Sequence, residues 1–473
     1  MYPKKIYVII LSATLFMSSC QKLITDPGGA SVLTQTTDNV VHWGNNYDDK
    51  GLAVVQTADG GYGVVGTEYH PVFQEQLMLV KFDSNMDYTD TLSFGGTKEN
   101  IADSSNQKAQ NLQQTIDGGY IFVGSTMNTD FNYDMWVVKY GPDLTTPIWE
   151  KTISGTDYYN YTYQNTEESI DESGKYNDYG NSIQQTEDGS YIVCGTIYDG
   201  NDNDIALWKI DLNDATDSLT LVYGENRDNG TCSNTTYQDS TNCVTASETW
   251  NKTLSITDNG TSDVGNYAQQ TNDGGYIIVG SSYSENTSYD IRLIKLKADF
   301  EIEFNKTYEI GSSYNDDEGI FVQQTSDNGY VIVGNYGGVG EGQVFILKTN
   351  YLGVRTTSQY YGSSQHPDIA ACVRQTNDNG FIMVGSKYSQ SSTMEDVWVV
   401  KFSHDLSPEW EQTFGGDLSD FGTSINQTSD GGYIITGYSY SYPADRNKQS
   451  EVILIKLDAD GLPEKKCIQC LDN

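Results

Sequence analysis

A block of eleven residues with a fixed order of polar and apolar positions recurs along the chain. Each copy opens with Gln-Thr-x-Asp, continues with two small residues and an aromatic residue, and ends with a mostly apolar run that stops at a glycine. A short apolar run between turn residues is typical of a strand that is buried on both faces. The seven copies begin at Gln56, Gln114, Gln185, Gln270, Gln324, Gln375 and Gln427.

The polar half of each block predicts a tight turn. An Asp side chain in a turn accepts hydrogen bonds from backbone N–H groups two residues on. The next two positions are Gly or Asn, apart from Ser190, and these residues tolerate positive φ. We therefore expect a β-hairpin at every copy, in which the Asp is a structural turn residue and not a metal ligand. These turn residues are Asp59, Asp117, Asp188, Asp273, Asp327, Asp378 and Asp430.

Another apolar segment follows each hairpin and ends near a lysine, as in DMWVVKY and DVWVVKF. Because a buried, unpaired ammonium group is very costly, we expect each lysine to pair with a carboxylate or with carbonyl oxygens in its own or the adjacent repeat. A fourth strand is marked by segments such as PIWEKTISG and PEWEQTFGG. The lysines are Lys81, Lys139, Lys209, Lys295, Lys348, Lys401 and Lys456.

Four short antiparallel strands repeated seven times predict an all-β fold, a seven-bladed β-propeller of four-stranded antiparallel blades. Each repeat adds its own layer of core, which lets one domain extend over residues 40–473. The segment VVHWGNNY around Trp43 is typical of a fourth strand and precedes the first hairpin. We therefore expect the ring to be closed by the N-terminal strand, with EKKCIQC near the C-terminus as the alternative closing strand.

The Thr-x-Asp-x-Gly pattern resembles the Asp-box hairpin of several bacterial propellers, including sialidases and some endo-acting glycoside hydrolases. The resemblance covers a few residues in each repeat, and the Trp that usually follows the box is absent here. In that family the Asp-box is structural and lies away from the catalytic centre. The resemblance therefore implies a turn role for the seven Asp residues and raises the expectation of enzymatic activity only slightly.

The N-terminus resembles a bacterial lipoprotein signal peptide. Lys4 and Lys5 precede a short apolar core at residues 6–17, and two serines then precede Cys20. The resemblance implies that residues 1–19 are removed and that Cys20 carries the lipid. Because Gln21 follows the cysteine, we expect attachment to the outer membrane, facing either the periplasm or the cell surface. The polar residues 20–39 are expected to form a lipidated flexible tether.

Two repeats are longer than the others, and the extra residues lie at about 156–178 and 225–262. Both inserts fall between a fourth strand and the next first strand, so we expect them on one face of the ring. Tyrosine rings stack on sugars or on peptide partners, which makes these inserts candidate binding loops. The alternative is that they are solvated loops packed on their own blades. The candidate ligand-binding residues are Tyr158, Tyr159, Tyr161, Tyr163, Tyr176, Tyr237 and Trp250.

The formal net charge of −38 argues against nucleic acid as a partner, since phosphate contacts need a basic face. Clustered carboxylates are hard oxygen ligands, so no cofactor is firmly expected but calcium is a candidate ligand. A disulfide between Cys232 and Cys243 fits an exported protein. Cys194 and Cys372 fall in apolar strands and are expected to be buried. Finally, the CxxC of Cys467 and Cys470 is expected to be a terminal staple rather than a redox centre or metal site.

No sequence motif identifies a catalytic mechanism. The chain has four histidines, none of them in HExxH, and it has no GxSxG motif and no phosphate-binding glycine loop. The sequence therefore favours a non-enzymatic cell-envelope propeller that binds a glycan or a protein on the insert-bearing face. The first alternative is a glycoside hydrolase or lyase that uses carboxylates on that face. The second is a structural subunit of an envelope complex.

Overall fold

The structure is a computed structural model. It describes most of the repeats and parts of the segments that join them. The described residues are 22–25, 31–37, 40–45, 47–70, 74–94, 107–127, 133–144, 147–153, 177–198, 203–211, 218–224, 231–232, 250–251, 262–284, 288–310, 316–337, 342–362, 366–389, 394–441 and 449–463.

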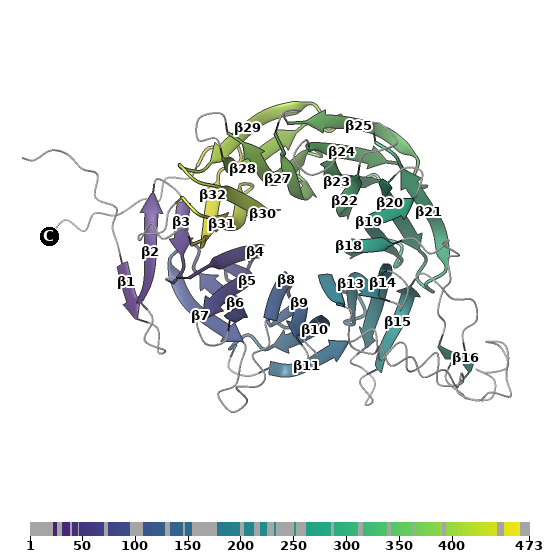
Figure 1. The fold of residues 1–473 in the computed structure, drawn as a ribbon, viewed down its shortest axis with the longest axis horizontal. Helices are drawn as coiled ribbons and strands as arrows, with labels where there is room; N and C mark the ends of the chain where they lie inside the picture. The colour runs from purple at the N-terminus through teal and green to yellow at the C-terminus, as the bar shows by residue number, and fades with distance from the viewer. Residues whose placement is uncertain are drawn as a thin grey trace, which may run out of the picture.

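The described residues form seven antiparallel blades arranged in a ring (Figure 1), which confirms the predicted fold class. The first three blades are β4 (Asp49–Gln56), β5 (Tyr62–His70), β6 (Gln74–Phe82) and β7 (Tyr88–Phe94); β8 (Gln107–Gln114), β9 (Tyr120–Met127), β10 (Tyr133–Tyr140) and β11 (Pro147–Ile153); and β12 (Tyr179–Gln185), β13 (Tyr191–Tyr198), β14 (Asn203–Asp211) and β15 (Ser218–Gly224).

The next three blades repeat the same order of four strands. They are β18 (Asp263–Gln270), β19 (Tyr276–Ser284), β20 (Ser288–Leu296) and β21 (Ile302–Tyr308); β22 (Asp317–Gln324), β23 (Tyr330–Tyr336), β24 (Gln343–Thr349) and β25 (Arg355–Tyr361); and β26 (Ile369–Gln375), β27 (Phe381–Tyr388), β28 (Glu395–Phe402) and β29 (Pro408–Phe414). A separate pair, β16 (Thr231–Cys232) and β17 (Trp250–Asn251), lies between the third and fourth blades in the sequence.

The seventh blade joins the two ends of the chain. It contains β30 (Asp420–Gln427), β31 (Tyr433–Ser439) and β32 (Glu451–Leu457), and its fourth strand is β3 (Val40–Trp43), which pairs antiparallel with β32. The N-terminal strand therefore closes the ring, as the sequence predicted, and it occupies the edge that the alternative EKKCIQC strand would have taken.

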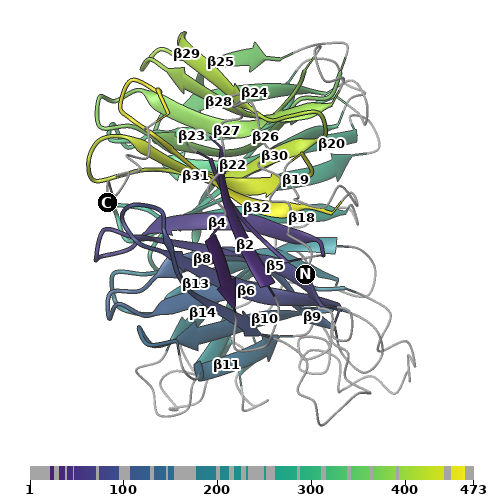
Figure 2. The same ribbon diagram turned by 90° about the vertical axis from the view of Figure 1, so that its left-hand side faces the viewer.

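Two further strands extend the seventh blade outward. These are β2 (Ser31–Thr37), which pairs with β3, and β1 (Lys22–Thr25), which pairs with β2. Both lie on the outer edge of the ring in Figure 1 and in the side view of Figure 2. The expectation of a flexible tether over residues 20–39 is thus wrong for these two stretches, because their backbones continue the ladder of the last sheet.

Each first strand carries a β-bulge near its start, and the bulge explains the glycine that ends each block. In the sixth blade the register shifts between Ala370 and Cys372. A Cβ atom on Gly385, in the paired strand, would overlap the carbonyl oxygen of Ile369. Only a glycine therefore fits beside the bulged strand. The same overlap with a first-strand carbonyl oxygen arises at Gly66, Gly195, Gly280, Gly334 and Gly437.

The core consists of apolar layers between adjacent blades. Second and third strands are buried along most of their length, as the continuous apolar runs predicted. The Cys194 and Cys372 side chains are buried in these layers as free thiols, and burial raises both thiol pKa values. Within the described ranges there is no helix of the length and apolar character needed to span a membrane.

The strand order gives the ring two distinct faces. The first hairpin turns and the turns between third and fourth strands share one face, which we call the turn face. First and third strands begin at the other face, and the inserts predicted from the sequence start and end there, so we call it the insert face. First strands, running from the insert face to the turn face, surround the central axis of the ring (Figure 1).

Candidate functional site

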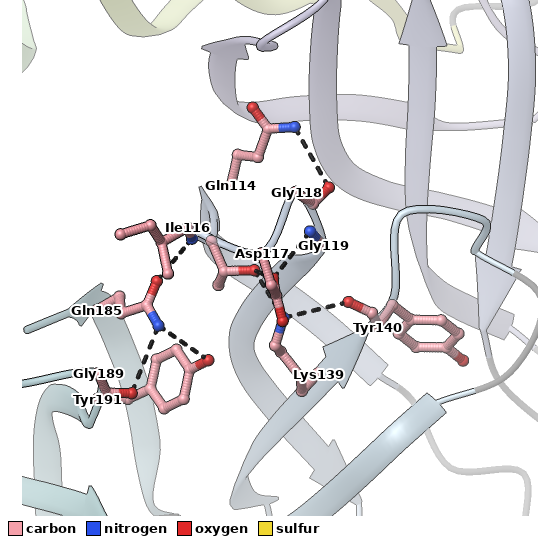
Figure 3. Close-up of polar contacts among 11 residues, drawn as sticks. Gln114, Ile116, Asp117, Gly118, Gly119, Lys139, Tyr140, Gln185, Gly189 and Tyr191 are labelled. Atoms are coloured by element: carbon pink, nitrogen blue, oxygen red, sulfur yellow. Dashed lines mark hydrogen bonds and ion pairs between the residues drawn. The ribbon is translucent and has the colours of Figure 1, made fainter.

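A Thr-Asp-Lys cluster organises the hairpin turn on the turn face in five of the seven blades. In the second blade, Asp117 accepts hydrogen bonds from the Thr115 hydroxyl and, at 3.0 Å, from the backbone N–H of Gly119 (Figure 3). The Lys139 ammonium lies 2.8 Å from the same carboxylate. Burial opposes ionisation of Asp117, but the hydrogen bonds from Lys139 and Thr115 outweigh it and lower the pKa to about 2.

The strand lysine and the turn aspartate thus form one unit, which the sequence analysis treated as two separate features. The lysine approaches the turn because the third strand ends where the second begins. Four other blades contain the same ion pair, at N–O distances between 2.6 and 2.9 Å: Lys209–Asp188, Lys295–Asp273, Lys401–Asp378 and Lys456–Asp430.

The remaining two strand lysines interact with the next blade. Lys81 lies over the ring of Tyr120, with its ammonium 5.8 Å from the ring centroid. Lys348 contacts the carbonyl oxygen of His404 at 3.1 Å and its imidazole Nε2 at 3.2 Å. Lys348 fits the expectation of a carbonyl partner in the adjacent blade. Lys81 departs from it, because it contacts an aromatic ring and influences the Asp59 carboxylate of its own blade only through its charge.

Seven glutamine side chains join the blades into a continuous ring on the turn face. The Gln that opens each block accepts a hydrogen bond from a backbone N–H in the turn of the preceding blade, as Gln185 does from Ile116 in Figure 3. The seven N–O distances lie between 2.7 and 3.0 Å. The bridge from Ser429 to Gln56 links the last blade to the first, so the circle is complete.

Buried aspartates occupy the opposite ends of the first strands. Each lies seven residues before the block glutamine, and none is more than 4% exposed. Asp420 accepts hydrogen bonds from the Gly416 N–H at 2.9 Å and the Ser441 hydroxyl at 2.7 Å, so it holds loops of the insert face in place. The six residues are Asp49, Asp178, Asp263, Asp317, Asp368 and Asp420.

Burial dominates the electrostatics of three of these aspartates. Burial raises the pKa of Asp317 to about 7. A hydrogen bond from the Ile310 N–H opposes this rise. The negative charges of Asp290, Glu309 and Asp316 add to it. Burial also raises the pKa values of Asp49 and Asp420. In the part of the chain that the structure describes, no group of three or more His, Cys, Asp or Glu side chains is placed to hold a metal ion.

The first strands enclose a polar central channel. Two cavities of about 260 and 220 Å³ follow one another along it and share lining residues from several blades. Side chains on the bulged segments bridge neighbouring blades: the amide nitrogens of Asn181 and Asn266 each donate to a glycine carbonyl of the next blade at 2.8 Å. Tyr267 and Phe321 add a pair of rings with centroids 4.0 Å apart.

One charged side chain lines this channel among the described residues. The Arg374 guanidinium carbon lies 4.6 Å from the centroid of the Phe321 ring, beside the Tyr267 side chain and the Cys372 thiol. Its Nε is buried and donates no hydrogen bond to any described group. None of the described residues that line the two cavities is acidic.

Most residues proposed from the sequence as binding or modification sites lie outside the described residues. These include the six insert tyrosines, Cys20, Cys243, Cys467 and Cys470. Of the second insert, the backbones of Cys232 and Trp250 are described, and they pair with each other in β16 and β17. The candidate site that the structure does describe, the central channel, was not proposed from the sequence.

Two of the missed features leave a trace in the sequence. An acidic residue stands seven positions before the block glutamine in six of the seven repeats. The position just before that glutamine is polar in six repeats, and Arg374 is the one cation among them. Aligning the seven repeats on the glutamine would have exposed both.

Comparisons with known proteins identify no family for this chain. No family model and no curated protein matches this chain. Among solved structures, similar folds include a protein of unknown function from Dyadobacter fermentans (11% identity, TM-score 0.45, covering 89% of this chain and 99% of that one) and the polysaccharide lyase Uly1 (11%, 0.46, 88% and 91%). A third is an α-L-arabinanase from Penicillium chrysogenum complexed with arabinobiose (10%, 0.42, 74% and 93%). Similarities this distant do not indicate a ligand for this chain.

Proposed function

We propose that this protein is a cell-envelope lipoprotein, held at the outer membrane by lipid on Cys20, that binds a glycan without cleaving it. The central channel and the insert face around it form the binding surface. The channel wall is the observation that supports this proposal. It presents amide, hydroxyl and aromatic groups, such as Asn111, Asn266 and Tyr267, on strands that interblade hydrogen bonds hold in place. Such groups hydrogen-bond and stack on sugars.

The electrostatics of the wall favour binding over hydrolysis. Glycoside hydrolysis generally needs two carboxyl groups on either side of the scissile bond. None of the described channel-lining residues is acidic. The buried aspartates at the insert-face end, such as Asp420, hold loops through hydrogen bonds, which leaves them little access to a substrate.

A glycan array tests this proposal, using the chain from residue 21 onward, which retains every described residue. Asn266→Leu removes a hydrogen-bonding group from the channel, and Asn377→Leu makes the same change at an exposed turn-face position. We expect array binding that Asn266→Leu reduces at least about tenfold, the equivalent of one lost hydrogen bond of ordinary strength, while Asn377→Leu leaves it unchanged.

Other outcomes would redirect the proposal. Binding that survives Asn266→Leu but disappears when residues 156–178 are deleted would place the site on the insert. Binding that requires added calcium would identify the ion as a ligand of the complex. Release of new reducing or unsaturated ends from a bound glycan would favour a hydrolase or lyase. Absence of glycan binding, with partners recovered from envelope extracts, would favour a structural subunit.

A further inference from the structure

Arg374 stands where four other blades follow a common pattern. In four blades the residue just before the block glutamine is itself a glutamine, and its side-chain oxygen accepts the backbone N–H of the next blade's block glutamine. Arginine has no acceptor, so the sixth blade cannot make this bridge to the seventh. The four bridging residues are Gln113, Gln184, Gln269 and Gln323, with N–O distances between 2.5 and 2.8 Å.

The presence of arginine in place of glutamine at this position puts a permanent positive charge inside the ring. A guanidinium group stays protonated at all ordinary pH values, and a buried charge without a counter-ion is costly. No described residue forms a salt bridge with Arg374. The Phe321 ring lies against its guanidinium, and Arg374 hydrogen-bonds with the side chains of Tyr267 and Cys372, neither of which is an ionised carboxylate. An arginine held in this state is suited to an anion that arrives from solution.

The groups around Arg374 narrow the chemistry of that anion. Asn181 and Asn266 donate their amide nitrogens to backbone carbonyls, which leaves each amide oxygen as an acceptor for a hydroxyl group. A cavity of about 260 Å³ is slightly smaller than common ligand pockets, which span about 300–1,000 Å³. One cation, several hydroxyl acceptors and room for a small ring match a sugar that carries one carboxylate.

We infer that the central channel binds the carboxylate of an acidic sugar, with the Arg374 guanidinium as the anion-binding group and Asn181 and Asn266 as acceptors for sugar hydroxyls. The planar guanidinium fork matches a carboxylate in two parallel hydrogen bonds, which a lysine in its place would not reproduce. This inference rests on the proposed glycan-binding function and specifies the class of sugar.

The test compares glucuronate with glucose as ligands in calorimetric titrations. Wild type is expected to bind glucuronate at least about tenfold more tightly than glucose, the contribution of one charge-assisted hydrogen bond. Arg374→Gln should abolish the preference, and Arg374→Lys should retain only part of it. Arg355→Gln is the matched control, because Arg355 is exposed on β25 at the outer side of the fifth blade.

Each result bears on the inference separately from the proposed function. Equal affinity of wild type for both sugars, or a preference that survives in Arg374→Gln, would overturn the inference. If neutral glycans bind on the array but glucuronate has no advantage, the glycan-binding function stands and the role of Arg374 falls. If glucuronate binds through Arg374 while no glycan on the array binds, the role of Arg374 stands and the glycan-binding function falls. Should Arg374→Gln unfold, Arg374→Lys carries the comparison, and an undiminished preference there would exclude the guanidinium fork.

Discussion

Aspartates lie near both ends of the first strand in six of the seven blades, and the two ends differ in their electrostatics. At the turn face Asp378 is largely exposed, lies 2.8 Å from Lys401 and has its pKa lowered to about 2. At the insert face Asp317 is buried, has negative neighbours and has its pKa raised to about 7. A repeated residue therefore has no single electrostatic role, because the partner and the burial decide which form is stabilised.

The two faces also differ in how far the blades repeat each other. Block glutamines bridge all seven junctions of the turn face, and that circle of hydrogen bonds fixes the blades relative to one another. Channel positions vary from blade to blade, with an aromatic residue in one, an amide in another and Arg374 in a third. The repeated residues build the frame, and the departures from the repeat provide groups that could recognise a ligand.

The largest effect on the free energy of unfolding is expected at the glycines beside the bulged strands, where the packing leaves no space for a Cβ atom. Gly385→Ala would push a methyl group into the carbonyl oxygen of Ile369, so the bulged strand would have to move. We expect a loss of about 3 kcal/mol in the free energy of unfolding, measured by urea titration. Gly342→Ala is the control, since its Cβ would meet no atom closer than 3.7 Å. Equal losses in both variants would show that the bulge does not require glycine.

A smaller effect is expected from breaking one turn-face cluster. Lys401 is 3% exposed and contacts Asp378, Glu409 and the Phe402 carbonyl oxygen. Lys401→Met keeps the buried stem but leaves that carbonyl without its donor, at a cost of about 1–2 kcal/mol in unfolding free energy. The exposed carboxylates can be hydrated and add little. Lys297→Met, at an exposed ion pair, should be neutral, and a neutral Lys401→Met would contradict the pairing role.

The smallest expected effect concerns the pH dependence of the unfolding free energy, to which the aspartates of the two faces contribute with opposite sign. Because the pKa of Asp317 is raised in the folded state, its contribution should make the protein more stable as the pH falls from about 7 towards 4. The turn-face aspartates, with pKa values lowered to about 2, should make the protein less stable as the pH falls from about 4 to 2. Unfolding free energy should therefore be highest in between.

Asp317→Asn separates the two contributions. The Asn side-chain oxygen can still accept the hydrogen bond of the Ile310 N–H, but the group no longer titrates. The variant should lose part of the rise between pH 7 and 4 and keep the fall below pH 4. An unchanged rise would mean that other buried carboxyl groups, such as Asp49, account for it.

The frame was predictable from the sequence because its pattern of turn and apolar residues recurs in seven repeats. Strand order, the hairpin turns and closure by the strand at Trp43 all followed from local patterns of turn and apolar residues. The glutamine bridges and the lysine–aspartate pairs were not predicted, because both join positions that only the packing of strands brings together. The prediction of a flexible tether was wrong for residues 22–25 and 31–37. Their composition is typical of a linker, and nothing in it indicates that they pair with the edge of the last sheet.

The channel could not be predicted for a different reason. The side chains of Tyr267, Phe321 and Arg374 meet only because three consecutive blades place equivalent strands around one axis. Within each repeat such a residue looks like ordinary variation. The insert tyrosines drew attention instead because they cluster in sequence, and their role as ligand-binding residues stays a prediction.

Closure of the ring by β3 has a consequence for how the protein is made. Val40 pairs with Ile455, so two segments separated by more than 400 residues must meet before the seventh blade exists. During synthesis the strand Val40–Trp43 emerges early and waits for its partner until almost the whole chain is complete. An apolar strand left waiting is a site for wrong pairing between molecules. Completion of the chain and the supply of chaperones, rather than equilibrium stability, should then limit the yield of folded protein.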